Sequence, residues 1–208
     1  MDVDDIVYKD ILFKAYHKAI ENDADIVLAN YIWLDEKTGK KTETKTKLND
    51  IVYSNRCSDI SNLLHTSPIQ CNRIIHRDLL IDNDLKFPIL KIGEDAYMHY
   101  TSLVVANKIV TMSDIIYAYV QHDGSACHTY DGRIMQITVA FNEVLEFYKK
   151  HKMDRYIGDI VEDKYFWYKG WIRKLLRYKT NDSQLVKDIL SVYEKDYEDT
   201  VREYGILD

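Results

Sequence analysis

The chain has 208 residues, of which 46% are hydrophobic and 12% aromatic, and its formal charge is −6 at pH 7. This length and composition provide one sizeable globular core, alone or with a helical annex, and exclude an intrinsically disordered protein. The acidic balance argues against nucleic-acid binding, which normally needs a basic excess. Glycine (7 residues) and proline (2 residues) are scarce, which favours long helices over an all-β protein built from tight turns.

The cysteines and the hydropathy pattern indicate the compartment. Cys57, Cys71 and Cys127 form no CxxC pair and lie far apart in the sequence, which is typical of reduced thiols. No secretory signal precedes the acidic start, and no apolar run approaches the roughly 18 residues that cross a bilayer. We therefore expect a cytoplasmic protein.

The chain starts with an acidic cluster, Asp2, Asp4 and Asp5, and an amphipathic helical pattern follows over residues 8–22. Two hypotheses explain the cluster. It either caps the following helix electrostatically, or its carboxylates bind a hard divalent cation such as Mg²⁺ or Mn²⁺, which can in turn hold a diphosphate.

The apolar run over residues 25–33 predicts a buried strand, and a helix followed by such a strand is the order of elements typical of an α/β protein. The polar run over residues 40–47 predicts an exposed arm that is more solvated than functional. Further elements are expected in chain order: a short helix capped by Ser58 and running to Leu64, a strand and then a helix over 71–80, a helix over 94–106, and strands over 109–112 and 115–120.

The pattern of the sequence changes after Gly132, where three segments with helical apolar spacing and abundant charge follow one another. They cover residues 134–151, 154–179 and 183–204. We therefore predict an α/β domain over residues 1–130 and a helical module over residues 131–208.

One helical segment, residues 164–179, has six basic residues and no acid in a chain that is acidic overall. Aromatic and basic residues mixed on a helix suit a membrane surface, and a peripheral contact with the inner face of the membrane is one hypothesis. The alternative, slightly favoured, is that Trp167, Trp171, Leu175 and Tyr178 pack this helix onto the domain while the bases face water.

Three patterns could carry chemistry. Glu94 and Asp95 follow a glycine at a predicted helix start, so either the acids suit the positive helix end or Asp95 faces a cleft as a general base. Asn72 and Arg73 form a polar patch between apolar segments, which is a surface turn or a binding patch. His122 follows a predicted strand, and strand ends of α/β sheets are frequent ligand sites.

The order of these features resembles family 2 glycosyltransferases of bacterial surface polysaccharide synthesis. The resemblance begins with the acidic cluster and the run Ala24–Tyr31, and continues through Asn72–Leu80, Leu85–Pro88 and Glu94-Asp95. It then includes Ala106–Val110, Tyr117–Tyr119 and Gly124-Ser125. Such collinear order over about residues 1–128 is much harder to obtain by chance than any single motif.

The resemblance implies a GT-A fold whose nucleotide-binding half precedes the acidic motif and whose acceptor-binding half follows it. It implies that Asp2 and Asp4, with Asp5 adjoining, hold Mg²⁺ or Mn²⁺ against a nucleotide-sugar donor, which is expected to be UDP-linked. Asp95 matches the acid that deprotonates the acceptor hydroxyl in inverting members. Asn72, Arg73, Glu94 and His122 are then the expected substrate-binding residues, with a saccharide or a lipid-linked molecule as acceptor.

The chain also departs from the family. An aromatic residue is usual where Cys71 stands, and basic residues are usual near Val120 and His122. The family's nucleotide-binding segments lie before the acidic motif, so we expect this chain to be the acceptor-side portion of a transferase. The alternative is a catalytically silent module that binds a saccharide or a partner protein. An open sheet edge left by missing strands would favour self-association.

Overall fold

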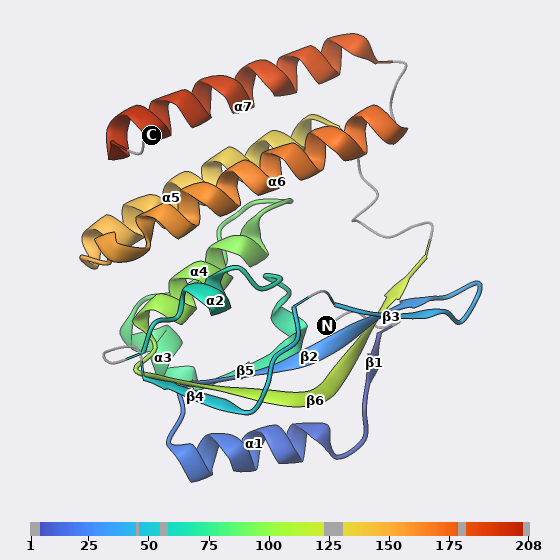
Figure 1. Cartoon of the computed structure of the whole chain (residues 1–208), viewed down its shortest axis with the longest axis vertical. Helices are drawn as coiled ribbons and strands as arrows, with labels where there is room; N and C mark the ends of the chain where they lie inside the picture. Colours follow the sequence, from blue (N-terminus) through green and yellow to red (C-terminus); the bar gives the residue numbers. More distant parts are fainter. Residues whose placement is uncertain (1–4, 45, 55–57, 123–130, 179–181, 206–208) are drawn as a thin grey trace. The chain divides into compact units, whose positions relative to one another are not determined.

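The structure is a computed structural model that describes residues 5–44, 46–54, 58–122, 131–178 and 182–205. It divides into two compact units, the first formed by residues 1–86 and 102–128 and the second by residues 87–101 and 129–208. The first unit is a mixed sheet with helices, and the second consists of helices (Figure 1). The predicted fold class, an α/β chain followed by helices, is thereby confirmed.

The sheet of the first unit is built around two long parallel strands, β2 (Ile26–Asp35) and β6 (Lys108–Gln121). Shorter strands pair antiparallel with their outer edges and complete a sheet of six strands among the described residues. On the β2 side these are β5 (Arg73–Ile75) and β3 (Lys41–Glu43). On the β6 side they are β4 (Ile51–Ser54) and β1 (Ile6–Val7).

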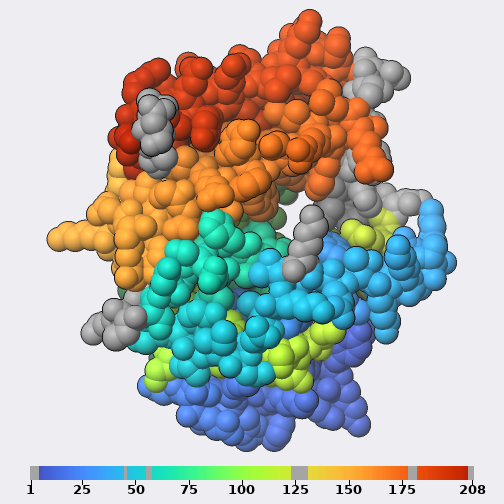
Figure 2. All heavy atoms as spheres, in the orientation of Figure 1, coloured from blue at the N-terminus to red at the C-terminus, as the bar shows by residue number. Residues whose placement is uncertain are grey.

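Helix α1 (Ile11–Asn22) packs against one face of this sheet through Ile11 and Ala15. These two side chains belong to a buried cluster with apolar residues of both central strands, among them Val27 and Val110. Burying this cluster is the main force that fixes the helix on the sheet. The opposite face of α1 is at the surface of the unit (Figure 2) and exposes Leu12, Phe13, Tyr16 and Ile20.

The two strands predicted over residues 109–112 and 115–120 are one continuous strand, β6, with an irregularity between them. The pairing with β2 shifts register on both sides of Asn30, so that Ala29 lies opposite Met112 and Asn30 opposite Ile115. A bulge of this kind bends a strand without ending it. The prediction was wrong here because Ser113 and Asp114 look like a turn when only local sequence is considered.

Three short elements connect the strands: α2 (Ser61–Leu64), a 3-10 turn η1 (Gln70–Asn72) and α3 (Arg77–Asp82). The strand and helix expected over residues 71–80 are confirmed as β5 and α3. The expected cap at Ser58 is wrong, because α2 begins at Ser61 and the Asp59 side chain accepts the Ser61 N–H at 2.9 Å.

The second unit contains three long helices, α5 (Gln136–Lys150), α6 (Ile157–Tyr178) and α7 (Ser183–Tyr204), each close to its predicted bounds. The turns η3 (Gly132–Met135) and η4 (Asp154–Tyr156) precede α5 and α6. Helix α4 (Glu94–Val105) contributes its residues up to 101 to this unit. No helix of the described residues combines the length and apolarity needed to cross a membrane.

A buried lysine joins α5, α6 and α7. Lys164 is completely buried, and its Nζ contacts Asp196 Oδ2 at 2.6 Å, Thr200 Oγ1 at 2.6 Å and Asn142 Oδ1 at 2.7 Å. The three ammonium hydrogens thus have three oxygen acceptors. Both sequence interpretations of residues 164–179 placed the basic side chains at the surface, which is wrong for Lys164, because its partners on the other two helices hold it inside.

Candidate functional site

A small pocket of the first unit lies along the outer edge of β2. Strand β5 pairs with Ile26–Leu28 and strand β3 pairs with Ile32–Leu34. The segment Ala29–Tyr31 lies between these two paired stretches, and all three of its residues line the pocket. The gap between β3 and β5 therefore creates a recess at a sheet edge.

The pocket has a volume of about 180 Å³ and a mixture of aromatic, hydroxyl and amide groups on its walls. Pockets that hold drug-sized ligands are larger, at roughly 300–1,000 Å³, so this one suits a single small ring. None of its described lining residues is charged, while Lys45 lies outside the described part of the chain. The lining comprises Ala29, Asn30, Tyr31, Trp33, Thr44, Thr46, Leu48, Thr66, Ser67 and Asn72.

Aromatic side chains form one side of this region. Trp33 contacts Tyr31 with ring centroids 5.6 Å apart and Tyr119 at 4.9 Å, both edge to face. Tyr31 is buried, whereas Trp33 is half-buried. Packed rings of this kind keep a rigid apolar surface.

Asn72 and Arg73, both predicted to bind substrate, are buried side chains rather than parts of a surface turn. Asn72 Nδ2 donates to the Ala29 carbonyl at 3.0 Å, and Asn72 also lines the pocket. Arg73 Nε lies 3.3 Å from Asn72 Oδ1, and its Nη2 donates to the Ile69 carbonyl at 3.0 Å. The structure therefore places Asn72 at the pocket and Arg73 directly behind it.

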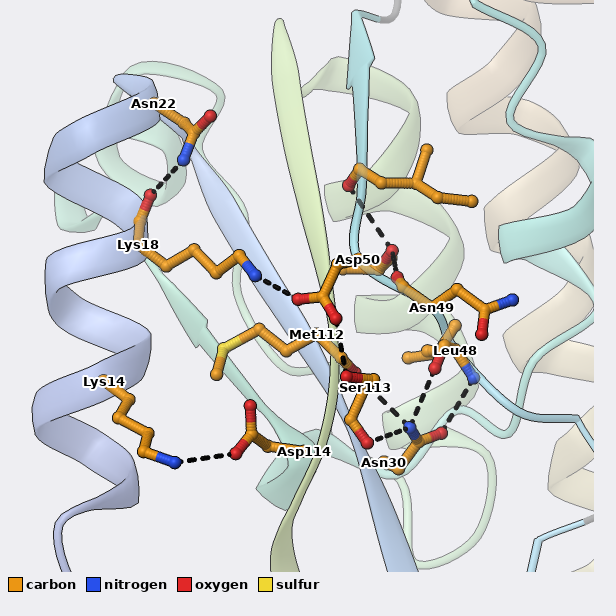
Figure 3. A network of polar contacts seen from close by, with 12 residues as sticks. Lys14, Lys18, Asn22, Asn30, Leu48, Asn49, Asp50, Met112, Ser113 and Asp114 are labelled. Carbon is orange, nitrogen blue, oxygen red and sulfur yellow. Dashed lines mark hydrogen bonds and ion pairs between the residues drawn. The ribbon is translucent and has the colours of Figure 1, made fainter.

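Asn30 fixes the wall of the pocket and was missed by sequence reasoning. Its Nδ2 donates to the carbonyls of Leu48 (2.9 Å), Ser113 (3.0 Å) and Met112 (3.3 Å), and its Oδ1 accepts the Leu48 N–H at 2.8 Å (Figure 3). One amide thus ties the 44–48 loop to both central strands at the bulge. A lone asparagine within an apolar strand was the signal that could have identified it, since buried amides need several partners.

The polar arm over residues 40–47 has two parts that the sequence interpretation did not distinguish. Lys41–Glu43 form β3 and are exposed. Thr44 and Thr46, which follow, line the pocket and bring hydroxyl groups to it. Threonine spacing alone does not reveal this role, because it depends on the loop being anchored through Leu48.

The predicted metal ligands are described only in part, because Asp2 and Asp4 lie outside the described residues. Asp5 is anchored on β6, where its Oδ1 accepts the Val120 N–H at 2.9 Å and its Oδ2 accepts the Tyr117 hydroxyl. Within the described parts of the chain, no group of three or more His, Cys, Asp or Glu residues is arranged to hold a metal ion.

Tyr117 joins the acidic start to the segment before β5. Burial raises the pKa of Tyr117, and hydrogen bonds with Asp5 and Cys71 raise it further. The phenol is therefore a hydrogen-bond donor throughout the physiological range. Cys71 is a half-buried free thiol, and it stands where the resemblance expected an aromatic side chain. His122, half-buried, directly follows β6.

Glu94 and Asp95 occupy the first turn of α4 and are described with the second unit. Gly93 precedes them with φ +102°, and a Cβ added there would lie 2.8 Å from Ala140 Cβ. Only glycine combines this backbone with so close an approach to α5. Both acids are half-buried, and Glu94 Oε2 is buried without a hydrogen-bond partner among the described residues.

The chain is an α/β protein whose first unit has a small pocket with no charged side chain among its described lining residues. In sequence, the chain is similar to glycosyltransferase GlyA of Streptococcus pneumoniae serotype 4 (strain ATCC BAA-334 / TIGR4), with 26% identity over 148 residues. That match covers 67% of this chain and 21% of GlyA, so the chain spans about a fifth of the relative's length. The expected resemblance to glycosyltransferases is confirmed. No model of a protein family matches the chain.

Solved structures that are similar to this chain include S. aureus TarS. The match to TarS 1–349 in complex with UDP-GlcNAc has 18% identity and a TM-score of 0.48, and covers 97% of this chain and 65% of that one. The match to TarS 1–349 in complex with UDP also has 18% identity, with a TM-score of 0.45, and covers 99% of this chain and 65% of that one.

Proposed function

We propose that this chain is the acceptor-side portion of an inverting, metal-dependent glycosyltransferase of the GT-A type. It would transfer a sugar from a nucleotide-diphosphate donor, UDP-linked in our proposal, to a saccharide or lipid-linked acceptor during assembly of a surface polysaccharide. The observation that carries the proposal is the 148-residue similarity to glycosyltransferase GlyA. The collinear order of the family motifs supports the finer parts.

In the proposed reaction, Asp95 removes the proton from the acceptor hydroxyl as that oxygen attacks the anomeric carbon of the donor sugar. The bond to the diphosphate breaks on the opposite face, so the anomeric centre is inverted. Mg²⁺ or Mn²⁺ held by Asp2 and Asp4, with Asp5 beside them, would balance the negative charge on the departing diphosphate. Glu94 would orient the loop that carries Asp95.

The pocket at the edge of β2 supports a saccharide as one ligand. Its hydroxyl and amide groups offer both donors and acceptors to a hydroxyl-rich ring, and Trp33 offers an apolar surface to the ring's C–H groups. The absence of charge among its described lining residues favours a neutral ring over a phosphate. Asn72 is the residue that both the family resemblance and the pocket geometry point to. Arg73, which is buried, would act by positioning Asn72, and His122 would contact substrate outside this pocket.

The transferase proposal is tested by joining the chain to a nucleotide-binding half and measuring nucleotide release from a panel of UDP-sugars, with and without Mn²⁺, in the presence of candidate acceptors. We expect release that depends on both metal and acceptor. Asp95→Asn should lower kcat by at least about a hundredfold, because loss of a general base typically costs that much. Glu143→Gln is the matched control, because Glu143 lies on the exposed side of α5. Turnover by Asp95→Asn equal to that of the parent chain would refute the assigned base.

The second candidate is a catalytically silent module that binds a saccharide or a partner protein. The absence of charge among the described lining residues of the pocket favours this alternative. It predicts binding of neutral sugars without turnover. It also predicts no calorimetric signal with UDP and Mn²⁺.

Saccharide binding is measured by calorimetry with glucose, galactose and N-acetylglucosamine. We expect Trp33→Ala to weaken binding at least about tenfold, since an aromatic anchor in a pocket typically contributes this much. Tyr16→Ala is the control, because Tyr16 is an exposed aromatic on α1 that does not line the pocket. Equal effects of the two substitutions would contradict a saccharide site at β2. Binding without turnover would support the silent module, and turnover would support the enzyme.

A further inference from the structure

One face of helix α6 carries large apolar side chains and cations together at the surface of the second unit. Phe166 is 54% exposed and Leu176 is 52% exposed. The cations Lys169 and Arg173 lie between them in the sequence and are also exposed. The spacing of three, four and three residues from 166 to 176 places all four on one side of the helix. We call these four residues the outer face of α6.

The cations of the outer face are not neutralised by neighbouring acids. No ion pair joins Lys169 or Arg173 to a carboxylate within the described parts of the chain, and the same holds for the exposed Lys174. The nearest aromatic partners are Tyr165, whose ring centroid is 5.5 Å from Lys169 Nζ, and Trp171, 4.5 Å from Lys174 Nζ. Residues 164–178 include no acid, so the cations of this face have no acidic partner on their own stretch of helix.

Helix α1 provides the contrast within the same chain. It also exposes apolar side chains, and Phe13 is 67% exposed. However, Lys14 Nζ pairs with Asp114 at 2.9 Å, and Lys18 pairs with Asp50 (Figure 3). The apolar face of α1 therefore lies beside cations that already have acidic partners. Of these two helices, only α6 joins strongly exposed apolar groups with cations that have no ion pair among the described residues.

The tryptophans do not belong to this face. Trp167 packs on Phe141 of α5 with ring centroids 5.9 Å apart, and Leu175 is fully buried. Trp167 and Leu175 attach α6 to the unit, as the packing alternative expected, while Trp171 is half-buried and the side chain of Tyr178 lies outside the described residues. The surface that remains available is made by Phe166 and Leu176, which sequence reasoning did not single out.

We propose that the outer face of α6 docks on an anionic phospholipid bilayer. Phe166 and Leu176 would enter the boundary between headgroups and acyl chains, while Lys169 and Arg173 contact lipid phosphates. Helix α7, which lies beside α6 at the surface in Figure 2, has six acids and three bases. Its charge disfavours anionic lipid and so orients the unit with α6 towards the membrane. The proposal does not depend on catalytic activity.

The proposal is tested by flotation of the whole chain with vesicles of phosphatidylcholine alone and of phosphatidylcholine mixed with phosphatidylglycerol. We expect binding only to the mixed vesicles, with a partition coefficient that falls as salt is added. Each cation near the surface contributes about fivefold, so Lys169→Gln combined with Arg173→Gln should lower partitioning roughly 25-fold. Phe166→Ala should lower it about tenfold.

Matched controls separate this face from the rest of the surface. Phe13→Ala removes an equally exposed aromatic from α1, and Lys187→Gln removes an exposed cation from α7. Both should leave partitioning within about twofold of the parent chain. The proposal is overturned if the parent chain does not float, if it binds neutral vesicles equally well, or if the controls match the α6 variants. It is also overturned if Phe166→Ala has no effect while the cation variants do. Binding would then be purely electrostatic, as to a polyanion, with no apolar side chain entering the bilayer.

Discussion

Asp196→Ala is expected to lower the free energy of unfolding by about 3–5 kcal/mol, because it removes the carboxylate from a buried ion pair. Asp196 accepts hydrogen bonds from Lys164 at 2.6 Å, Tyr168 at 2.5 Å and Asn142 at 2.7 Å. Lys164 has no access to water, so its charge would remain buried with only neutral oxygens beside it. Burial already lowers the pKa of Lys164, while Asp196 opposes that change.

Urea unfolding followed by the helical circular dichroism signal measures this effect. Asp199→Ala is the matched control, since Asp199 lies on the same helix and its pair with Arg202 is exposed. Exposed pairs of this kind contribute at most about 1 kcal/mol. The double variant Lys164→Met with Asp196→Leu should recover most of the stability, because it removes both charges. A cost for Asp196→Ala no greater than that for Asp199→Ala would mean that Lys164 is hydrated.

The second large effect is expected at alkaline pH. Four fully or almost fully buried tyrosines of the second unit have a pKa that burial raises, namely Tyr100, Tyr148, Tyr168 and Tyr193. Below about pH 10 these phenols are protonated in the folded and the unfolded chain alike. Above it the unfolded chain releases protons that the folded chain retains, so stability falls as pH rises. Four such groups give a slope of about 5 kcal/mol per pH unit.

Lys164 acts in the opposite sense, because its folded pKa is lowered. Between that value and about 10.4 the unfolded chain holds more protons, so this one group favours folding as pH rises. Its contribution is complete above that range, where the buried tyrosines lower stability as pH rises. Urea midpoints measured across this interval, together with tyrosinate absorbance, report the slope.

Tyr193→Phe isolates one group of the four. Tyr193 stacks on Tyr168 at 4.0 Å, and its hydroxyl donates to the Ile134 carbonyl at 2.7 Å. Phenylalanine keeps the ring and removes the titrating phenol, so the slope above pH 10 should fall by about 1.4 kcal/mol per pH unit. Tyr16→Phe should leave the slope unchanged, because Tyr16 is exposed. Unfolding that shows no such pH dependence would contradict burial of these rings.

Elements in which apolar residues recur at a regular helical spacing were predicted well. The spacing of apolar residues predicted α7 over residues 183–204, and the helix has these bounds. The Asp182 side chain caps it by accepting the Leu185 N–H at 3.0 Å, and Gly205 with φ +64° ends it. Both ends are encoded by neighbouring residues, which is why the sequence alone was sufficient.

The pocket could not be predicted in the same way, because it is the space between two strands that are far apart in the sequence. Strand β3 ends at Glu43 and β5 begins at Arg73, and both pair with β2. The recess exists only because these pairings leave Ala29–Tyr31 between them. Asn30 then closes it through acceptors as far away as Ser113.

The sequence by itself determined the α/β class, the helical C-terminal module and the similarity to glycosyltransferases, because periodicity and collinear motifs are local properties of the chain. Tertiary structure alone decided that Lys164 is buried while Lys169 and Arg173 are exposed. In a basic run these residues look alike. The acceptors of Lys164 lie on other helices, 22 and 36 residues away in the sequence. Burial of a charge depends on such distant partners, which no local pattern of the sequence contains.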